Sequence, residues 1–231
     1  MENNKNSNTK LIAGSILIIG VIIAGAILIK NHPAPTTPKD DQNKGNITST
    51  LSDIGNISSE DVVLGNPNAK VTYIEYGDYQ CPVCGVFFSQ IEPQLKKDYI
   101  DTGKVKFVFR SFQFLGQESF DSAAAVLCAK DQGKFYEFSN AIYTAENLDG
   151  KERNGNLNKD LFLKIADQIG LDKATFTTCY DSGKYVEKIK SDSDKIQSLG
   201  VNSTPTSVIN GTVVVGLDYG KIKSTIDAAL K

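Results

Sequence analysis

Residues 71–84 have the sequence VTYIEYGDYQCPVC, and this stretch decides how the chain folds. Its first part, residues 71–76, is rich in β-branched and aromatic residues, which is typical of a strand. Two cysteines, Cys81 and Cys84, follow after a short turn, and residues 86–99 then have the apolar spacing of an amphipathic helix. A CxxC pair at the junction of a strand and a helix indicates a thiol–disulfide redox site.

The positions of the two cysteines favour disulfide exchange. Two intervening residues let both sulfurs meet across one helical turn, and Pro82 falls at the first helical position, where its missing N–H has no cost. Cys81 then lies at the positive end of the helix dipole, beside unpaired backbone N–H groups that stabilise a thiolate. Because the thiolate is the nucleophile in disulfide exchange, we expect Cys81 to be the nucleophile and Cys84 the resolving thiol.

Two other interpretations of the CxxC pair stay open. It could be half of a zinc site, but such a site needs a second CxxC or a pair of histidines. The chain has one histidine, His32, and its other cysteines, Cys128 and Cys179, are isolated, so we expect no metal. A closed CxxC disulfide with a purely structural role is the second alternative.

Length and charge limit the classes of function. The chain has 231 residues, with 25 Lys and Arg against 27 Asp and Glu, which gives a net charge of −2. Nucleic-acid-binding domains normally carry a basic surface, so this balance argues against nucleic acid as a partner. The pattern predicts one globular region without internal repeats.

Residues 11–29 form an uncharged run, mostly Ile, Leu, Val, Ala and Gly, between Lys10 and Lys30. A helix of this length spans roughly 28 Å, about one hydrocarbon core. The run is longer than the apolar part of a signal peptide, and no good cleavage site follows, so we expect an uncleaved transmembrane anchor, with a removed signal as the alternative. Residues 1–10 would be a short flank and residues 30–59, rich in Asn, Thr, Ser and Pro, a flexible linker.

The compartment is predicted from the cysteines more than from the charges. Lysines flank the apolar run on both sides, so orientation is only weakly encoded. Four cysteines with an expected disulfide role favour an oxidising compartment. We therefore expect a single-pass protein of the cell membrane whose globular region is extracytoplasmic.

The globular region, residues 60–231, falls into three blocks. Alternating apolar residues in 104–110 indicate a second core strand, and the order strand, helix, strand predicts a βαβ unit with parallel strands. From about 116 to 200 the apolar spacing is helical, and glycines follow several of the helical stretches as stop signals. Residues 207–215, with Asn-Gly at their centre, predict a β-hairpin, and 219–231 a closing helix.

With these elements in place, the chain resembles the DsbA-like thiol–disulfide oxidoreductases of the thioredoxin superfamily. The resemblance rests on EYGDYQCPVC at 75–84 and on STPT at 203–206, directly before the hairpin. It covers about residues 60–231 and implies an α/β thioredoxin fold with a helical insertion domain, here preceded by the predicted transmembrane helix. It also implies that the redox-active disulfide Cys81–Cys84 serves in place of an external cofactor.

The resemblance assigns substrate-binding roles around the CxxC pair. Pro205 matches the family's cis-proline, which faces the disulfide, and Thr204 before it would offer backbone groups to an extended substrate peptide. Pro82 and Val83, between the cysteines, would also contact substrate. An ordinary trans proline in a turn is the alternative for Pro205.

Glu75 matches the family's buried acidic residue beneath the disulfide. If it is buried without a partner, its pKa rises, and it can relay a proton to or from Cys84. Strand alternation places Tyr73, Glu75 and Gly77 on one face, but the other face is equally apolar. The sequence alone therefore does not bury Glu75, and a surface-facing strand residue is the alternative.

Two further features relate the chain to that family. Val83 departs from the His that is common here in strongly oxidising members, and a protonated His would help to stabilise the Cys81 thiolate, so we expect a less oxidising couple. Cys128 and Cys179, 51 positions apart, resemble the second, structural disulfide of a subset of the family. Two buried free thiols are the alternative.

The expected function is that of an enzyme, a membrane-anchored thiol–disulfide oxidoreductase that introduces disulfides into reduced secreted or surface proteins through Cys81–Cys84. The resemblance implies reoxidation by a membrane quinone-linked oxidase of the DsbB or VKOR type. Two alternatives stay open: the same fold acting as a reductase or isomerase, and a tethered binding module whose CxxC pair is only structural.

Overall fold

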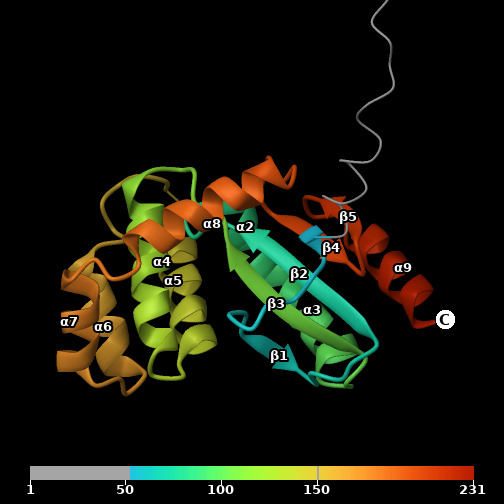
Figure 1. The fold of residues 1–231 in the computed structure, drawn as a ribbon, viewed down its shortest axis with the longest axis horizontal. Helices are drawn as coiled ribbons and strands as arrows, with labels where there is room; N and C mark the ends of the chain where they lie inside the picture. Colours follow the sequence, from blue (N-terminus) through green and yellow to red (C-terminus); the bar gives the residue numbers. More distant parts are fainter. Residues whose placement is uncertain (1–52, 150) are drawn as a thin grey trace, which may run out of the picture. The chain divides into compact units, whose positions relative to one another are not determined.

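Five strands form one mixed sheet in the computed structural model, which describes residues 53–149 and 151–231 (Figure 1). Their order across the sheet is β1-β3-β2-β4-β5. The central strands β2 and β3 are parallel, as the predicted βαβ unit requires, and the other neighbouring pairs are antiparallel. The strands are β1 (Val63–Gly65), β2 (Val71–Gly77), β3 (Val105–Ser111), β4 (Thr206–Ile209) and β5 (Thr212–Val215).

The crossover from β2 to β3 is a continuous helix whose winding alternates. It begins at Pro82 in the first helical position, with Cys81 as N-cap, as the sequence predicts. Two stretches have π-helical rather than α-helical hydrogen bonding. The consecutive segments are α2 (Pro82–Val86), η1 (Phe87–Ile91), α3 (Glu92–Leu95) and η2 (Lys96–Ile100).

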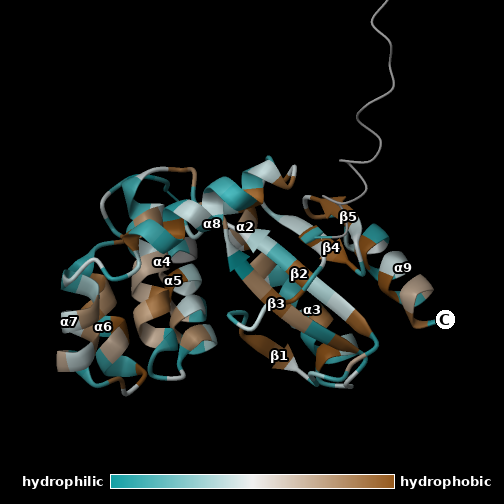
Figure 2. Ribbon diagram, in the orientation of Figure 1, coloured by the Kyte–Doolittle hydropathy of each residue, from teal (hydrophilic) through white to brown (hydrophobic). Residues whose placement is uncertain are grey.

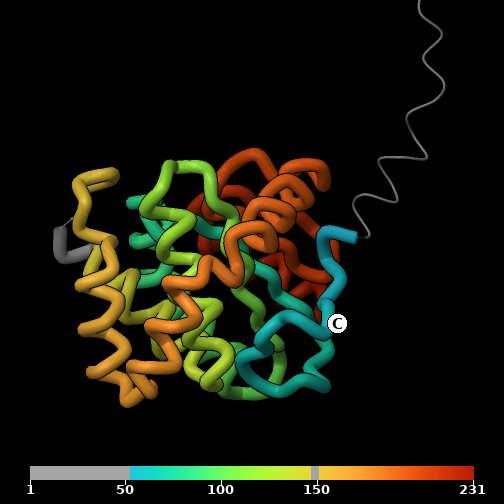
Figure 3. The backbone as a smooth tube through the Cα atoms, turned by 60° about the vertical axis from the view of Figure 1, so that its left-hand side comes forward, coloured from blue at the N-terminus to red at the C-terminus, as the bar shows by residue number. Residues whose placement is uncertain are grey.

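Between β3 and β4 the described residues form five helices, which confirm the predicted helical insert. Four of them pack together on one side of the sheet, and the fifth, α8, runs from this bundle back to the sheet (Figure 1, Figure 3). Gly170 and Gly200 follow α6 and α8 with φ of +75° and +90°, the left-handed conformation that ends a helix. The helices are α4 (Gln117–Lys130), α5 (Phe135–Asp149), α6 (Lys159–Gln168), α7 (Lys173–Asp181) and α8 (Val186–Ser198).

Each face of the sheet has its own apolar core, because strand side chains alternate between the two faces. Figure 2 shows hydrophobic residues along the strands and in the helices. Tyr73 and Phe107 lie on the face covered by the crossover helix and by α9 (Tyr219–Leu230). Ile74 and Val108 lie on the opposite face, which is covered in part by Ile196 of α8. Both faces of β2 are therefore buried.

The predicted hairpin is confirmed. β4 and β5 are antiparallel, with Ile209 opposite Thr212. Between them, Asn210 and Gly211 have φ of +44° and +85°. Positive φ at both central residues is the conformation that an Asn-Gly turn supplies.

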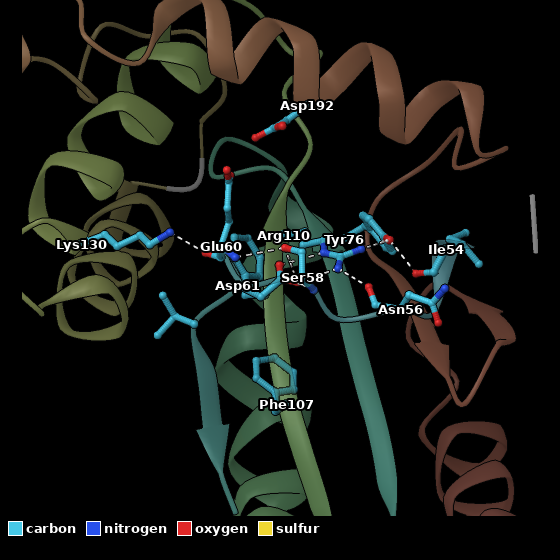
Figure 4. A network of polar contacts seen from close by, with 12 residues as sticks. Ile54, Asn56, Ser58, Glu60, Asp61, Tyr76, Phe107, Arg110, Lys130 and Asp192 are labelled. Carbon is cyan, nitrogen blue, oxygen red and sulfur yellow. Dashed lines mark hydrogen bonds and ion pairs between the residues drawn. The ribbon is translucent and has the colours of Figure 1, made fainter. Parts of the chain in front are cut away.

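Part of the predicted linker is folded against the sheet. Ile54 is 2% exposed and packs on the sheet face that also holds Ile74. Arg110 of β3 holds this segment: its guanidinium donates to both carboxylate oxygens of Asp61, at 3.0 and 2.7 Å, and to the Asn56 carbonyl (Figure 4). Apolar residues at the end of the Asn-, Ser- and Thr-rich stretch thus extend the domain to at least residue 53.

The predicted flank (1–10) and transmembrane anchor (11–29) lie outside the described residues, as does most of the predicted linker (30–59). Within 53–149 and 151–231, no helix combines the length and apolarity needed to cross a bilayer.

Candidate active site

Cys81 and Cys84 lie where β2 ends and the crossover helix begins. Both are free thiols, Cys81 7% exposed and Cys84 fully buried. The Cys81 backbone N–H donates to the Asp78 carbonyl, and its own carbonyl accepts from the Gly85 N–H in the first helical turn. Cys81 therefore sits at the N terminus of the helix, with its sulfur near the surface and that of Cys84 beneath it.

The two thiols have opposite acidities. The pKa of Cys81 is lowered to about 6, chiefly by a hydrogen bond from the Cys84 thiol; burial opposes this, while Thr204 and backbone N–H groups of Val83 and Cys84 add to it. Burial, followed by the hydrogen bond to Cys81, raises the pKa of Cys84 well above its usual range. At neutral pH Cys81 is thus mostly a thiolate and Cys84 a thiol, the division of roles that the sequence predicts.

Thr204 and Pro205 face the cysteines from the loop before β4. Their peptide bond is cis, as the resemblance implies. The Cys81 sulfur lies 3.7 Å from the Thr204 carbonyl oxygen. The Thr204 hydroxyl is buried as well. The loop therefore brings backbone and hydroxyl oxygens next to the nucleophilic sulfur.

Pro82 and Val83 lie at the surface, with Val83 43% exposed. An exposed valine beside Cys81 offers an apolar contact but no charge.

Glu75 lies buried in β2, 2% exposed. Its neighbours across the sheet are Phe109 of β3 and Ser207 of β4. Its Oε2 atom has no hydrogen-bond partner within the described part of the chain. Burial first, and then the negative charges of Glu92 and Cys81, raise its pKa well above the usual range. The alternative of a surface-facing Glu75 is thereby excluded, since both sheet faces are covered.

Asp78, three residues before Cys81, is a site residue that the sequence reasoning missed. It is fully buried, and its carboxylate accepts hydrogen bonds from the Ser119 hydroxyl at 2.7 Å and from the backbone N–H groups of Gln80, Phe114 and Leu115. Burial raises its pKa, and these donors oppose the rise. Asp78 thus joins the turn before the cysteines to the loop after β3. An Asp in the turn directly after a strand is the signal that could have found it.

Cys128 and Cys179 form a disulfide with an S–S distance of 2.03 Å. It joins α4 to α7 within the helical insert. The structure therefore brings Cys81, Cys84, Glu75 and the Thr204–Pro205 loop together, and places the second disulfide in another part of the fold. Among the described residues, no group of three or more His, Cys, Asp or Glu side chains is arranged to hold a metal ion.

The sequence and fold match known proteins over most of the chain. The family described as Thioredoxin matches residues 58–228. The "Probable disulfide bond formation protein D" of Bacillus cereus is 30% identical over 224 residues, covering 95% of this chain and 99% of that protein. The "Disulfide bond formation protein D" of Bacillus subtilis is 35% identical over 180 residues, covering 73% of this chain and 77% of that protein.

Solved structures agree with these matches. The crystal structure of oxidised BdbD from Bacillus subtilis superposes with a TM-score of 0.65 at 32% identity, covering 74% of this chain and 92% of that one. Wolbachia pipientis alpha-DsbA1 gives a TM-score of 0.69 at 25% identity, covering 78% and 96%.

Proposed function

Because the chain belongs to the thioredoxin family and is a DsbA-like protein thiol–disulfide oxidoreductase, we propose that it works as an oxidase that introduces disulfides into secreted or surface proteins. The observation that carries the proposal is the position of Cys81, a free thiol at the N terminus of the crossover helix with the buried Cys84 thiol beside it. This arrangement lowers the pKa of Cys81 to about 6. A stabilised Cys81 thiolate favours the reduced enzyme, and a stable reduced form makes the oxidised form a good acceptor of electrons.

The chemistry uses two exchanges. A substrate thiolate attacks the Cys81 sulfur of the Cys81–Cys84 disulfide, the S–S bond breaks, and Cys84 leaves and takes a proton. A second substrate thiolate then attacks the substrate sulfur of the mixed disulfide, and Cys81 leaves as a thiolate. Together the two exchanges move two electrons from the substrate to Cys81–Cys84 and leave one new disulfide in the substrate. Glu75 is the proposed source of the proton for the buried Cys84.

The proposed setting is the outer face of the cell membrane. Residues 11–29 would anchor the chain, and the Asn-, Ser- and Thr-rich stretch after them would let the domain reach both its substrates and a membrane-embedded redox partner. A quinone-linked oxidase of the DsbB or VKOR type would take two electrons from Cys81–Cys84 and restore the disulfide.

The reduction potential of the full-length chain tests the direction of the reaction. The fraction of reduced Cys81–Cys84 is measured in glutathione buffers, with intact mass after alkylation to show that Cys128–Cys179 stays closed. A potential near or above about −150 mV supports the oxidase. A value near about −270 mV, as in thioredoxin, makes the chain a reductant and overturns the proposal.

A trapping experiment tests whether the CxxC pair exchanges with proteins at all. Replacing Cys84 with Ala removes the resolving thiol, so mixed disulfides between Cys81 and substrates should accumulate in cells. The double variant Cys81→Ser, Cys84→Ala is the control and should trap nothing. No adducts in either strain would favour a binding module.

Fractionation of cells tests the setting. The full-length chain should stay with the membranes after a high-salt or alkaline wash and be released by detergent. A chain recovered in the soluble fraction, shortened at its N terminus, would show a cleaved signal instead.

A further inference from the structure

Gln80, the residue directly before Cys81, connects the turn that carries the nucleophile to the helical insert. Its side chain is fully buried. The amide nitrogen Nε2 donates to the Ser119 hydroxyl of α4 at 3.1 Å, and Oε1 accepts from the backbone N–H of Arg153 at 2.8 Å. The loop that follows α5 is thereby fixed against the immediate neighbour of Cys81.

Arg153 is held in an unusual conformation within this loop, residues 151–158. Its φ is +54°, in the left-handed region that a non-glycine residue keeps only where its surroundings impose it. The backbone N–H is bonded to Gln80, and the side-chain Nε donates to the Leu115 carbonyl in the loop after β3. Both the backbone and the side chain of Arg153 are therefore fixed in position.

The rest of the loop is anchored on the insert. The Glu118 carboxylate of α4 accepts the backbone N–H groups of Gly155 at 3.1 Å and Leu157 at 3.2 Å. Leu157 is 1% exposed and packs in the core. The Asn156 side chain donates to the Glu146 carboxylate of α5 at 2.9 Å. A loop held in this way loses little conformational entropy when it contacts a substrate.

Both anchors of Arg153 belong to the surroundings of the nucleophile. Gln80 precedes Cys81 in the chain, and the Leu115 N–H donates to the Asp78 carboxylate at 3.3 Å. The Asp78 carbonyl in turn accepts the Cys81 N–H at 3.1 Å. Two separate paths of hydrogen bonds therefore join Arg153 to the turn that carries Cys81.

The exposed side chains next to this turn are apolar or cationic. Phe114, directly before Leu115, is 46% exposed, and Val83, two residues after Cys81, is 43% exposed. Arg153 is exposed as well, and it forms no ion pair with any residue in 53–149 or 151–231. A substrate that approaches Cys81 thus meets apolar side chains and, beside them, a guanidinium that no described carboxylate neutralises.

Nearby carboxylates are already bonded to other groups. That of Asp78 accepts the N–H groups of Phe114 and Leu115, and that of Glu118 accepts two N–H groups of the loop. The terminal nitrogens of a guanidinium offer parallel N–H donors, which match the two oxygens of a carboxylate. The chemistry that fits Arg153 is therefore an acidic side chain brought by the substrate.

We propose that Arg153 is a specificity-determining residue for the exchange reaction, whose guanidinium binds an acidic side chain of the substrate close to its reacting cysteine. The inference deepens the proposed function and rests on exchange through Cys81–Cys84. An extended peptide advances about 3.3 Å per residue, so side chains two to four positions from the substrate cysteine reach from Cys81 over the neighbouring loop. An exposed ion pair is weak and is screened by salt, so Arg153 biases the choice of substrate without being required for exchange.

The test measures rate constants for reduction of the oxidised, full-length chain by pairs of dithiol peptides. Each pair differs only in Glu or Gln at one position, two to four residues before or after the first cysteine. In each turnover the peptide thiols become a disulfide, and the Cys81–Cys84 disulfide becomes two thiols. At the position that contacts Arg153, the Glu-to-Gln ratio of rate constants should be about two- to fivefold higher in wild type than in Arg153→Gln, and high salt should reduce this difference.

The ratio separates recognition from a general loss of reactivity. The acidity of the peptide thiols cancels, because the same peptides meet every variant, and so does any effect of a substitution that is common to both peptides. Arg153→Glu should reverse the preference, so that Lys at the same peptide position reacts faster than Gln. Lys151→Gln, which removes an exposed lysine of the same loop, is the matched control and should keep the wild-type ratio.

Equal ratios in wild type and Arg153→Gln at every peptide position would overturn the inference. An equal loss of the ratio in Lys151→Gln would overturn it too, because the effect would then come from the overall charge of the loop. A wild-type chain that oxidises none of the peptides would contradict the proposed function instead.

Discussion

At the residue scale, position 83 adds no charge to the stabilisation of the Cys81 thiolate. Val83 is 43% exposed beside Cys81 and carries no charge, so the hydrogen bond from Cys84 and the helix N terminus act without it. Replacing Val83 with His should lower the pKa of Cys81 below about 6 and raise the reduction potential, since each tenfold change in the exchange equilibrium is about 30 mV. The rate of alkylation as a function of pH measures the pKa of Cys81, and a titration with glutathione buffers measures the reduction potential. An unchanged pKa and potential would contradict the argument, and Val83→Thr serves as the uncharged control.

The burial of Glu75 leads to a second prediction at the residue scale, which concerns the stability of the fold. Its pKa is raised in the folded chain from a reference of 4.5, so folding binds a proton and the carboxyl destabilises the fold increasingly as pH rises above about 4.5. Glu75→Gln should therefore raise the free energy of unfolding at pH 7, while slowing exchange. The gain should vanish at pH 4. Urea unfolding at both pH values measures it, and equal gains at both would rule out titration as the cause.

Local spacing predicts some site residues and not others. Cys81, Cys84 and Pro82 follow from the strand-to-helix junction, because their roles depend on positions within one helical turn. The burial of Glu75 does not follow from local spacing, because both faces of β2 are apolar. Only the packed sheet shows which elements cover each face.

At the element scale, the second disulfide joins α4 to α7 and should matter for stability more than for exchange. It closes a loop of 51 residues, for which the chain-entropy model gives roughly 4 kcal/mol. Replacing both Cys128 and Cys179 with Ala should lower the free energy of unfolding by up to that amount. The reduction potential of Cys81–Cys84 should stay within about 10 mV of wild type, because the disulfide lies in the insert. A large change in the reduction potential would show instead that the two disulfides are energetically coupled.

The elements also differ in how far the sequence predicts them. The hairpin and the helix ends follow from Asn-Gly and from glycines with positive φ, which are local requirements. The π winding of the crossover helix, in Phe87–Ile91 and Lys96–Ile100, has no such local signal in the sequence.

At the scale of the whole molecule, the acidity of one thiol links stability to redox state. In the reduced chain the pKa of Cys81 is about 6 against a reference of 9.0, so folding releases a proton. A depressed pKa contributes stability that is fully present above pH 9 and is lost as pH falls through 6. At pH 7, one unit above the folded pKa, about 1.4 kcal/mol remains. The oxidised chain has no such thiolate.

The reduced chain should accordingly gain about 1.4 kcal/mol over the oxidised chain between pH 5 and pH 7, on top of any difference that does not depend on pH. Urea unfolding of both forms at the two pH values measures this, with limiting reductant and an intact-mass check that Cys128–Cys179 is closed. Cys81→Ser is the control, because it removes the titrating sulfur and should abolish the pH-dependent part. A disulfide donor must be more stable after it has given its disulfide away, so the same free energy drives electrons from substrate thiols into the enzyme. If the reduced chain shows no such gain in stability, the case for an oxidase is weakened.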